Sequence, residues 1–419
     1  MISYEQALNL ITSQISSKPQ SLNLPIAKAL GHVADQAVNC ACYISPFDNS
    51  AMDGFAFRYA ELQQGRRQFA VVGSSFAGDT IDQSTEGAWE IMTGAGIPNG
   101  FDTVIKIEDI AILVTNEAGR PTKIKLNINP KDIIFENNVR KKGQDFKPDD
   151  LVVEADEVIT PSHISALASV GIANIRVRKK PNIAVISTGK EIIDDANMAL
   201  LSGQIRNSNG PSLMASFAGM NLAVSYAGTI RDEVEDFETC IKGLLNDNDI
   251  IISTGAVSMG RHDFIPESLQ RLGAEIIFHK CKIRPGKPIL FAKFPPTDLN
   301  PDGVFYFGLP GNPVSAHVGL RFFIMPLINR LLGLKAEHPV RAFLTADIDK
   351  KHDFKMFYKA FATLENGHLS VTILQGQESF RIKPLLKANC WAVLGEHQHK
   401  CATGGLIDIY PMMANQWSF

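Results

Sequence analysis

The spacing of apolar residues changes along the chain, and each change predicts a different kind of domain. The capping box from Ser3 to Gln6 precedes apolar residues at helical spacing and predicts a helix near the N-terminus. Residues 66–160 instead form short β-branched runs broken by glycines, which predicts a small β-rich domain set into a helical frame. The frame resumes at Thr160, a predicted N-cap with Pro161 at the first helical position.

Beyond Pro181 the pattern becomes an alternation of buried strands and helices. The runs NIAVIS, LAVSYAG, DIIIST and VFYFG are continuously apolar, as strands are when both faces of a parallel sheet are covered. The segments between them with helical length and spacing are 210–219, 233–246 and 263–272. A closing helix begins after Pro313 and ends near Gly333. This alternation predicts a doubly wound α/β domain.

The last part of the chain is strand-like again and predicts a C-terminal β domain. Its hairpin signal is Asn366-Gly367, which stands between FYKAFATL and HLSVTIL. The expected fold class is therefore multidomain α/β plus β. The expected domains are an elongated helical or linking domain at 1–45 and 146–179, an inserted β-rich domain at 46–145, the α/β domain at 180–334 and the C-terminal β domain at 335–419.

Composition narrows the class of protein. With 45% apolar and 20% charged residues, the 419-residue chain is typical of a folded protein of several domains. A net charge of −3 without long runs of one sign argues against a nucleic-acid binder. The N-terminus lacks the features of a secretory signal, and no uncharged apolar run reaches about 18 residues. We therefore expect a cytoplasmic protein with no membrane segment.

The six cysteines form no CxxC pair, so neither a structural zinc site nor a disulfide framework is expected. The cluster with metal-binding residue types is His397, His399 and Cys401, which alternating strand positions would place on one face. No fourth ligand is evident for a metal there. A solvated strand edge is the favoured interpretation.

Three glycine-rich turns follow predicted strands: STGKE at 187–191, STGAVSMGRHD at 253–263 and GLPGNPVSA at 308–316. Ligands of open parallel sheets bind at the carboxyl ends of the strands. Glycine lets the backbone approach a ligand closely, and successive N–H groups favour an anion such as phosphate. Together the turns predict a phosphate or carboxylate site, and tight turns without a ligand are the alternative.

Charged residues near these turns fit the same chemistry. Glu191, Asp232 and Asp263 each follow the end of a predicted strand, and carboxylates suit Mg²⁺ that also contacts substrate phosphates. Each acid could instead cap a helix N-terminus or stand in its first turn. Arg284 and Lys287 in KIRPGKP can face a phosphate or an oxyanion, with a solvated charged loop as the alternative.

Two other enzyme classes do not fit the sequence. The chain has no GxxxxGK[ST] string, which excludes a P-loop nucleotide hydrolase at the motif level. The string AVSMG at 256–260 departs from the GxSxG nucleophile elbow at Ala256, and no acid and histidine follow in convincing order. A serine hydrolase is therefore not expected.

The string FDNSAMDGFA at 47–56 resembles the signature of the MoeA-type molybdopterin molybdenumtransferases and of the related gephyrin E-domain. Further strings resemble this family in the same order along nearly the whole chain. They are IMTGA, VRKKGQD, TGKE, IRDE, TGAVSMGRHDF, RPGKP and LPGNPVSA, followed by a weaker match at Glu378-Ser379 and KANC. FDNSAMDG and LPGNPVSA are the most specific of these strings.

The resemblance implies a fold, an assembly and a reaction. The implied fold has a helical frame, an inserted β domain, a molybdopterin-binding α/β domain and a C-terminal β domain. The implied assembly is a homodimer, with the active site between the α/β domain and the partner's inserted domain. The implied reaction inserts molybdenum from molybdate into adenylylated molybdopterin and releases AMP, assisted by a divalent cation, here expected to be Mg²⁺. The upstream adenylyltransferase and the recipient molybdoenzymes are implied partners.

The resemblance also assigns site residues by position. The residues with an implied catalytic role are Asp53, Glu191, Asp232, Asp263 and Lys287, of which Glu191, Asp232 and Asp263 are the implied metal ligands. The residues with an implied role in substrate binding are Thr93, Arg140, Asp145, Gly189, Lys190, Thr254, Gly255, Ser258, Arg284, Pro310, Gly311, Asn312, Pro313 and Ser379. Asp53 has a structural alternative, because it could cap a turn within FDNSAMDG.

Four residues depart from the family pattern. Lys190 stands where the family has Asp or Asn, and Ala256 stands where it has the second glycine of SGGVS. Arg284 replaces a lysine, and Lys359 replaces an arginine that many relatives have. We expect an active enzyme in which Lys190 adds positive charge near the oxyanion or phosphate. The alternatives are a catalytically impaired cofactor-binding or scaffold relative, a tungstate-inserting variant, and an adenylyltransferase that acts one step earlier.

Overall fold

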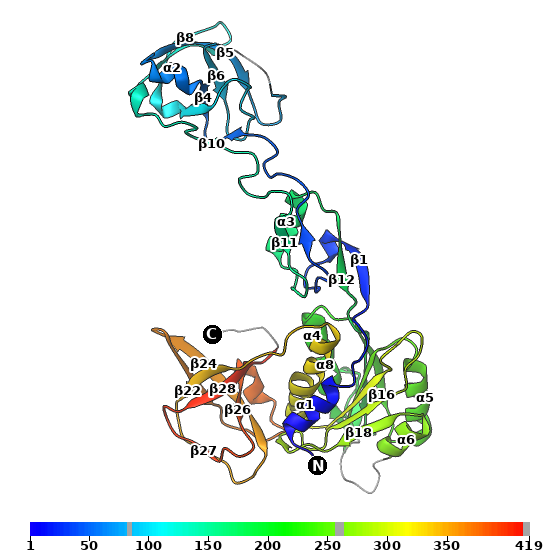
Figure 1. Cartoon of the computed structure of the whole chain (residues 1–419). Coiled ribbons are helices and arrows are strands. Elements are labelled where there is room, and N and C mark those ends of the chain that lie inside the picture. The colour runs from blue at the N-terminus through cyan, green and yellow to red at the C-terminus, as the bar shows by residue number, and fades with distance from the viewer. Residues whose placement is uncertain (82–85, 256–263, 414–419) are drawn as a thin grey trace. The chain divides into compact units, whose positions relative to one another are not determined.

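The computed structural model describes residues 1–81, 86–255 and 264–413, and the chain separates into two compact units (Figure 1). Unit 1 contains Met1–Leu22, Gly31–Val33 and Val177–Phe419. Unit 2 contains Asn23–Leu30 and Ala34–Arg176. No helix in the described part of the chain is long and apolar enough to cross a membrane.

A mixed six-stranded sheet forms the centre of unit 1, in the order β16-β13-β17-β21-β20-β18. The first four strands are parallel and coincide with the four apolar runs of the sequence: β16 (Val224–Ile230), β13 (Ile183–Thr188), β17 (Ile250–Thr254) and β21 (Phe305–Leu309). The antiparallel strands are β20 (Leu290–Lys293) and β18 (Glu275–His279). The predicted doubly wound α/β fold is confirmed, with an antiparallel edge that the sequence pattern did not indicate.

Helices cover both faces of this sheet (Figure 1). Because successive strand residues point to opposite faces, each face has a hydrophobic core of its own. Ile183 and Val185 share a core cluster with residues of α1 (Tyr4–Thr12), α4 (Asn209–Gly219), α7 (Pro313–Gly319), the π-helical segment η4 (Leu320–Ile324) and α8 (Met325–Leu331). Ala184 and Ile186 share the opposite cluster with residues of α5 (Val234–Leu244) and α6 (Ile265–Arg271). The capping box at Ser3 is confirmed, since Ser3 and Gln6 exchange hydrogen bonds at 2.9 and 3.1 Å.

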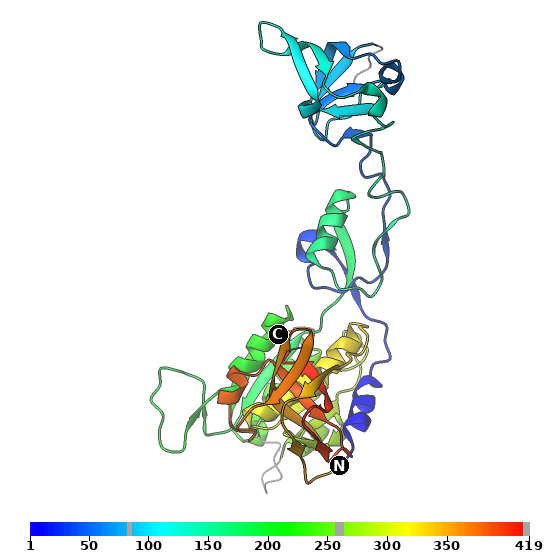
Figure 2. The ribbon, with the colours of Figure 1, turned by 90° about the vertical axis from the view of Figure 1, so that its left-hand side faces the viewer.

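The C-terminal part of unit 1 is a closed sheet, shown in orange and red in Figure 2. Its strands follow the order β19-β24-β25-β22-β28-β26, and an additional β24–β26 pairing joins five of them into a barrel. The barrel strands are β22 (Val340–Leu344), β24 (Lys355–Glu365), β25 (His368–Ile373), β26 (Cys390–Leu394) and β28 (Leu406–Pro411). The predicted hairpin is confirmed, because Asn366 and Gly367 connect β24 to β25 with φ of 50° and 78°.

Short elements complete unit 1. They are the pair β14 (Ile192–Ile193) and β15 (Ile205–Arg206), the pair β23 (Ile348–Asp349) and β27 (Lys400–Cys401), the strand β19 (Ile283–Arg284) and the 3₁₀ turn η5 (Lys383–Leu386). β19 comes from the α/β part of the chain and pairs in parallel with β24 of the barrel. This pairing ties the KIRPGKP segment to the C-terminal domain.

Unit 2 contains the β-rich domain, whose six-stranded sheet has the order β7-β4-β6-β5-β9-β8. These strands are β4 (Gly54–Phe57), β5 (Gln68–Ser75), β6 (Ala88–Ile91), β7 (Thr103–Lys106), β8 (Ile110–Thr115) and β9 (Pro121–Leu126). Helical segments in the same domain are α2 (Tyr59–Gln63), η2 (Ile107–Asp109) and η3 (Pro130–Asp132). Phe55, Phe57 and Phe69 are fully buried or nearly so and belong to its core.

The rest of unit 2 consists of paired short strands and one helix. The pairs are β1 (Ser21–Pro25) with β12 (Asn174–Arg178), β2 (Val38–Asn39) with β11 (Leu151–Val153), and β3 (Asn49–Ser50) with β10 (Val139–Arg140); a 3₁₀ turn, η1, spans Ile26–Lys28. The helix α3 (Pro161–Ser169) begins as predicted, because the Thr160 hydroxyl accepts a hydrogen bond from the His163 N–H. The predicted inserted β-rich domain is confirmed as part of the fold.

Candidate functional site

The first residues of three glycine-rich turns lie next to one another at one edge of the unit 1 sheet. They follow the neighbouring parallel strands β13, β17 and β21, in which Ser187 lies opposite Thr254 and Thr254 opposite Leu309. This edge therefore carries Gly189, Thr254, Gly255 and the turn from Pro310 to Asn312. The sequence-assigned residues Ser258 and Asp263, and the departure at Ala256, lie outside the described residues.

Gly255 brings two of these turns into close backbone contact. Its φ is +97°, and its N–H donates to the Leu309 carbonyl at 3.0 Å. A Cβ at this position would collide with the Thr188 carbonyl oxygen, so only glycine meets both requirements. Gly311 lies close by, since a Cβ built there would stand 3.7 Å from the Gly255 Cα. A ligand above these turns would therefore meet backbone atoms directly.

Side chains from neighbouring elements hold this edge in place. Thr188 Oγ1 donates to the Thr254 carbonyl at 3.0 Å, and Asn209 Nδ2, at the start of α4, donates to the Gly311 carbonyl at 2.8 Å. The Thr254 hydroxyl is buried and has no hydrogen-bond partner among the described residues. A buried hydroxyl without a partner is uncommon and fits a ligand-binding position. Sequence reasoning missed Asn209, although Asn-Ser-Asn directly before a predicted helix is a signal for capping side chains.

The acids of this edge are exposed carboxylates. Glu191 folds over the first turn, so that its oxygens lie 2.8 and 2.9 Å from where a Cβ at Gly189 would stand. Asp232 stands two residues beyond Ile230, whose carbonyl accepts from the Gly189 N–H at 3.2 Å. No group of three or more His, Cys, Asp or Glu side chains within residues 1–81, 86–255 and 264–413 is arranged to hold a metal ion. The third assigned metal ligand, Asp263, is not among them.

A polar network holds the loop that carries Glu191. Asp194 accepts hydrogen bonds from Asn207 Nδ2 at 2.7 Å, from the Tyr226 hydroxyl at 2.8 Å and from the Thr229 N–H at 3.0 Å. Partial burial raises the pKa of Asp194, but these hydrogen bonds outweigh it and lower the pKa below the ordinary value. The network was missed in the sequence because its members belong to separate segments that only the folded sheet brings together.

A cavity of about 1060 Å³ lies within unit 1 and is lined by both the α/β part and the C-terminal barrel. Five of the assigned site residues line it: Arg284, Lys287, Pro310, Asn312 and Ser379. Pro310 and Asn312 also belong to the third glycine-rich turn, and Pro313 begins α7 directly after it. The cavity and the strand edge therefore share one turn.

The acids that line this cavity are all engaged with other groups. Asp347 accepts from the Thr403 N–H and hydroxyl at 2.7 Å each, and these hydrogen bonds lower its pKa. Asp349 pairs with Lys400 at 3.6 Å, and Glu378 pairs with Arg381 at 3.0 Å. Basic neighbours therefore balance the charges of Asp349 and Glu378, whereas neutral donors stabilise Asp347.

The two cations that line the cavity have no acidic partner among the described residues. Arg284 ends β19 and lies opposite Met356. Burial raises the pKa of Tyr358, and the nearby charge of Arg284 partly opposes this shift. Lys287 is exposed, and its Nζ lies 6.0 Å from the centre of the Phe354 ring. Because Arg284 and Lys287 have no acidic partner in the described part of the chain, their part of the cavity wall favours an anion.

In unit 2, Asp53 and Thr93 contact each other directly. Asp53 Oδ1 accepts from the Thr93 N–H at 2.7 Å and from the Thr93 hydroxyl at 2.8 Å. These two hydrogen bonds lower the pKa of Asp53 and keep it a carboxylate. Asp53 thus joins two separate loops of the β-rich domain through Thr93, a contact outside the turn within FDNSAMDG.

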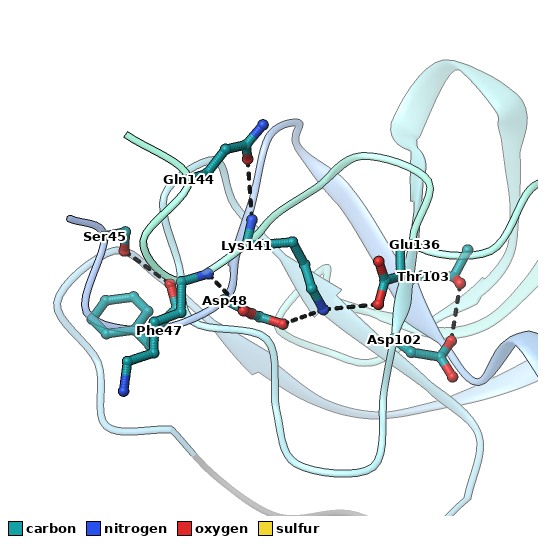
Figure 3. Close-up of polar contacts among 9 residues, drawn as sticks. Ser45, Phe47, Asp48, Asp102, Thr103, Glu136, Lys141 and Gln144 are labelled. Carbon is teal, nitrogen blue, oxygen red and sulfur yellow. Dashed lines mark hydrogen bonds and ion pairs between the residues drawn. The ribbon is translucent and has the colours of Figure 1, made fainter. Parts of the chain in front are cut away.

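The remaining assigned residues of unit 2 are Arg140 and Asp145, which flank Lys141 in the sequence. Figure 3 shows Lys141 in a cluster of ion pairs with Asp48 and Glu136. Lys141 pairs with Asp48 at 2.6 Å and with Glu136 at 2.8 Å, which raises the pKa of Lys141. Arg140, the residue before Lys141, lies opposite Asn49 of the signature string, and its side chain is exposed. Asp145 is also exposed, and its N–H donates to the Ile44 carbonyl at 3.0 Å.

The one-face arrangement expected for His397, His399 and Cys401 is wrong. Only Lys400 and Cys401 are in a strand, β27, and Cys401 is buried in the barrel core. The two histidines stand in the exposed turn before it, 3.9 Å and 3.1 Å from Asp353. The turn interrupts the strand alternation on which the expectation depended.

Three family models match successive parts of the chain. The MoeA N-terminal region (domain I and II) matches residues 2–171. The "Probable molybdopterin binding domain" matches residues 184–330, and the MoeA C-terminal region (domain IV) matches residues 341–412.

Full-length relatives agree with these matches. A molybdopterin molybdenumtransferase of Staphylococcus aureus (strain Mu50) is 32% identical over 418 residues, which are 97% of this chain and 95% of the relative. The protein of that name from Haemophilus influenzae is 32% identical over 98% of each chain. Two solved structures of molybdopterin biosynthesis proteins from Pyrococcus horikoshii share the fold. The first has a TM-score of 0.78 and is 26% identical, and the match covers 99% of this chain and 100% of that chain. The second has a TM-score of 0.75 and is 23% identical, and the match covers 98% of this chain and 99% of that chain. The chain therefore belongs to the molybdopterin molybdenumtransferase family.

Proposed function

We propose that this protein transfers molybdenum from molybdate to adenylylated molybdopterin and releases AMP. The observation that carries the proposal is a pair of cations, Arg284 and Lys287, which have no acidic partner in the described part of the chain. They line a cavity that shares the turn from Pro310 to Asn312 with the glycine-rich strand edge. AMP release that depends on added molybdate tests the proposal. Release at the same rate without molybdate would contradict it.

The two anions of this reaction would meet at separate but adjoining surfaces. The pyrophosphate of adenylylated molybdopterin would lie at the turns that contain Gly189, Gly255 and Gly311, because glycine-rich turns after parallel strands suit a phosphate. The molybdate dianion fits the cavity, where Arg284 and Lys287 supply positive charge. Because like charges repel, neutralising both anions in advance lets them approach each other.

Mg²⁺ would be held by Glu191 and Asp232, whose exposed carboxylates have no ion-pair partner among the described residues, together with Asp263. When bound, the ion would supply a Lewis acid that neutralises phosphate oxygens. Asp194 and its hydrogen-bond partners would keep the Glu191 loop in position for this role.

Lys190 is exposed beside Glu191, and its charge would favour anionic substrates. Replacement of Lys190 by aspartate is expected to raise KM for molybdate or for adenylylated molybdopterin by about three- to tenfold at low salt. The effect should shrink as salt is added, because exposed charges are screened. Steady-state kinetics at two ionic strengths measure it, with Lys242→Asp on the exposed side of α5 as the matched control. Unchanged molybdate affinity and turnover would contradict a role for Lys190.

The active form in this proposal is a homodimer in which each site combines unit 1 of one chain with the β-rich domain of its partner. Asp53→Ala and Lys287→Ala alter the two contributions separately, so neither variant alone should be active. Random mixing of their subunits should restore about a quarter of wild-type activity, because half of the dimers are mixed and each has one intact site. Subunit mixing after mild denaturation measures this. A mixture as inactive as its parents would contradict a shared site.

A further inference from the structure

Lys359 is a lysine where an apolar residue would be expected. It lies in β24 of the C-terminal barrel and is 0% exposed. Lysine is almost never fully buried unless its charge is compensated, because desolvating an ammonium group is costly. Burial lowers the pKa of Lys359, and the nearby Glu378 opposes that shift. The charge must therefore be stabilised by the groups around it.

The ammonium group of Lys359 is saturated by backbone carbonyls. Its Nζ donates to the carbonyl of Gly376 at 2.7 Å, of Glu378 at 3.2 Å and of Arg381 at 3.2 Å. A lysine ammonium has three donor hydrogens and no acceptor. All three donors are used within the protein, so none is left for a ligand.

The backbone of Lys359 holds the same loop from its other side. Its N–H donates to Gln377 Oε1 at 3.0 Å, and its carbonyl accepts from Gln377 Nε2 at 2.9 Å and from the Leu374 N–H at 3.0 Å. The loop from Leu374 to Arg381 is thus folded around this one residue. We name it the Lys359 loop.

The Lys359 loop forms one wall of the cavity and touches the α/β part of unit 1. Leu374, Gln375 and Ser379 line the cavity. The Ser379 carbonyl accepts a hydrogen bond from the Val314 N–H at 3.0 Å, in the first turn of α7. Any displacement of this loop would move Ser379 and remove the acceptor from Val314.

We infer that Lys359 is a positioning residue: it fixes the loop that carries Ser379 against the start of α7 and makes no contact with the oxyanion itself. The role of Lys359 in holding the loop is independent of the proposed function, and only its consequence for oxyanion binding rests on that function. The substrate-facing group on this wall would be Ser379, held in place by Lys359.

Amide hydrogen exchange without any substrate tests the positioning role. In Lys359→Met, the amides of Leu374 and Val314 lose or weaken their acceptors and should exchange at least about tenfold faster. Gln377→Ala, which leaves the barrel interior intact, should act in the same direction with a smaller effect. Asn389→Ala is the matched control, because Asn389 exchanges hydrogen bonds with Ala362 on the same strand at 2.7 and 2.8 Å and lies outside the segment from Leu374 to Arg381.

The outcomes separate the two possible roles of Lys359. Faster exchange at Leu374 and Val314 in Lys359→Met and Gln377→Ala, but not in Asn389→Ala, supports positioning. Unchanged exchange in the first two variants, with weaker molybdate binding by calorimetry in Lys359→Met, would overturn it and indicate a direct ligand. Because the exchange measurement needs no substrate, it stands or fails independently of the proposed reaction. If that reaction also holds, Lys359→Met should raise KM for molybdate more than KM for adenylylated molybdopterin, with partial rescue by Lys359→Arg.

Discussion

Replacement of Lys287 by methionine is expected to slow molybdenum insertion by about a hundredfold or more, which is the usual loss when one group that stabilises an oxyanion is removed. Methionine keeps an unbranched apolar stem and removes the charge. Of the two cations among the described lining residues, the cavity would then keep Arg284 alone. Single-turnover AMP release at saturating adenylylated molybdopterin measures the effect.

The matched control for this variant is Lys282→Met. Lys282 lies in the same segment as Lys287 but does not line the cavity. Its replacement should leave the rate within about twofold of wild type, as is usual for surface substitutions away from a site. Equal losses in both variants would mean that the segment matters only as structure. No loss in Lys287→Met would contradict the assignment of the cavity as the oxyanion site.

Replacement of Gly255 by alanine is expected to abolish most activity and to lower the free energy of unfolding by about 3 kcal/mol or more. The backbone at Gly255 has a φ of +97°, which L residues rarely adopt, and the added Cβ would collide with the Thr188 carbonyl oxygen. To relieve the collision, the turn must move away from β13. The hydrogen bond from the Gly255 N–H to the Leu309 carbonyl would then be lost, and with it the surface proposed for the pyrophosphate.

Gly273→Ala separates the two causes of this loss. Gly273 has a similar φ of +91°, but a Cβ there would meet nothing within 4 Å. Its replacement should cost only the backbone strain, about 1–2 kcal/mol, and leave activity unchanged. Denaturant unfolding and the AMP assay measure both properties. A Gly255→Ala variant as stable and active as Gly273→Ala would show that the turns do not depend on this close approach.

The α/β core was predictable because its strands are buried on both faces. The runs around Ile183, Ile250 and Phe305 are continuously apolar and alternate with helical segments, as is typical of covered parallel strands. The antiparallel strand β18 gave no comparable signal, because its edge position leaves part of it exposed, and β20 is buried but only four residues long. The capping box at Ser3 predicted a helix but could not show that α1 packs on the α/β core, since packing partners are set by tertiary structure.

The site was predictable where chemistry is local in the sequence and not where it is assembled by the fold. Glycine-rich turns after strands identified Gly255, because its close backbone approach demands glycine. Lys359 was noted only as a departure from a family pattern, since its acceptors are backbone carbonyls of a distant loop, which leave no trace in the side-chain sequence. His397 and His399 were misplaced because a turn interrupted the alternation that a strand would have given.

The measurement that tests the central claim most directly combines the purified protein with adenylylated molybdopterin, molybdate, Mg²⁺ and a cofactor-free molybdoenzyme. AMP release and recovery of the molybdoenzyme's activity are followed together, with Lys287→Met in parallel. The account predicts that AMP and active enzyme appear together in the wild type and that both fall in the variant. Tight binding of adenylylated molybdopterin without AMP release or activation would contradict it and identify a cofactor-binding relative that has lost metal insertion.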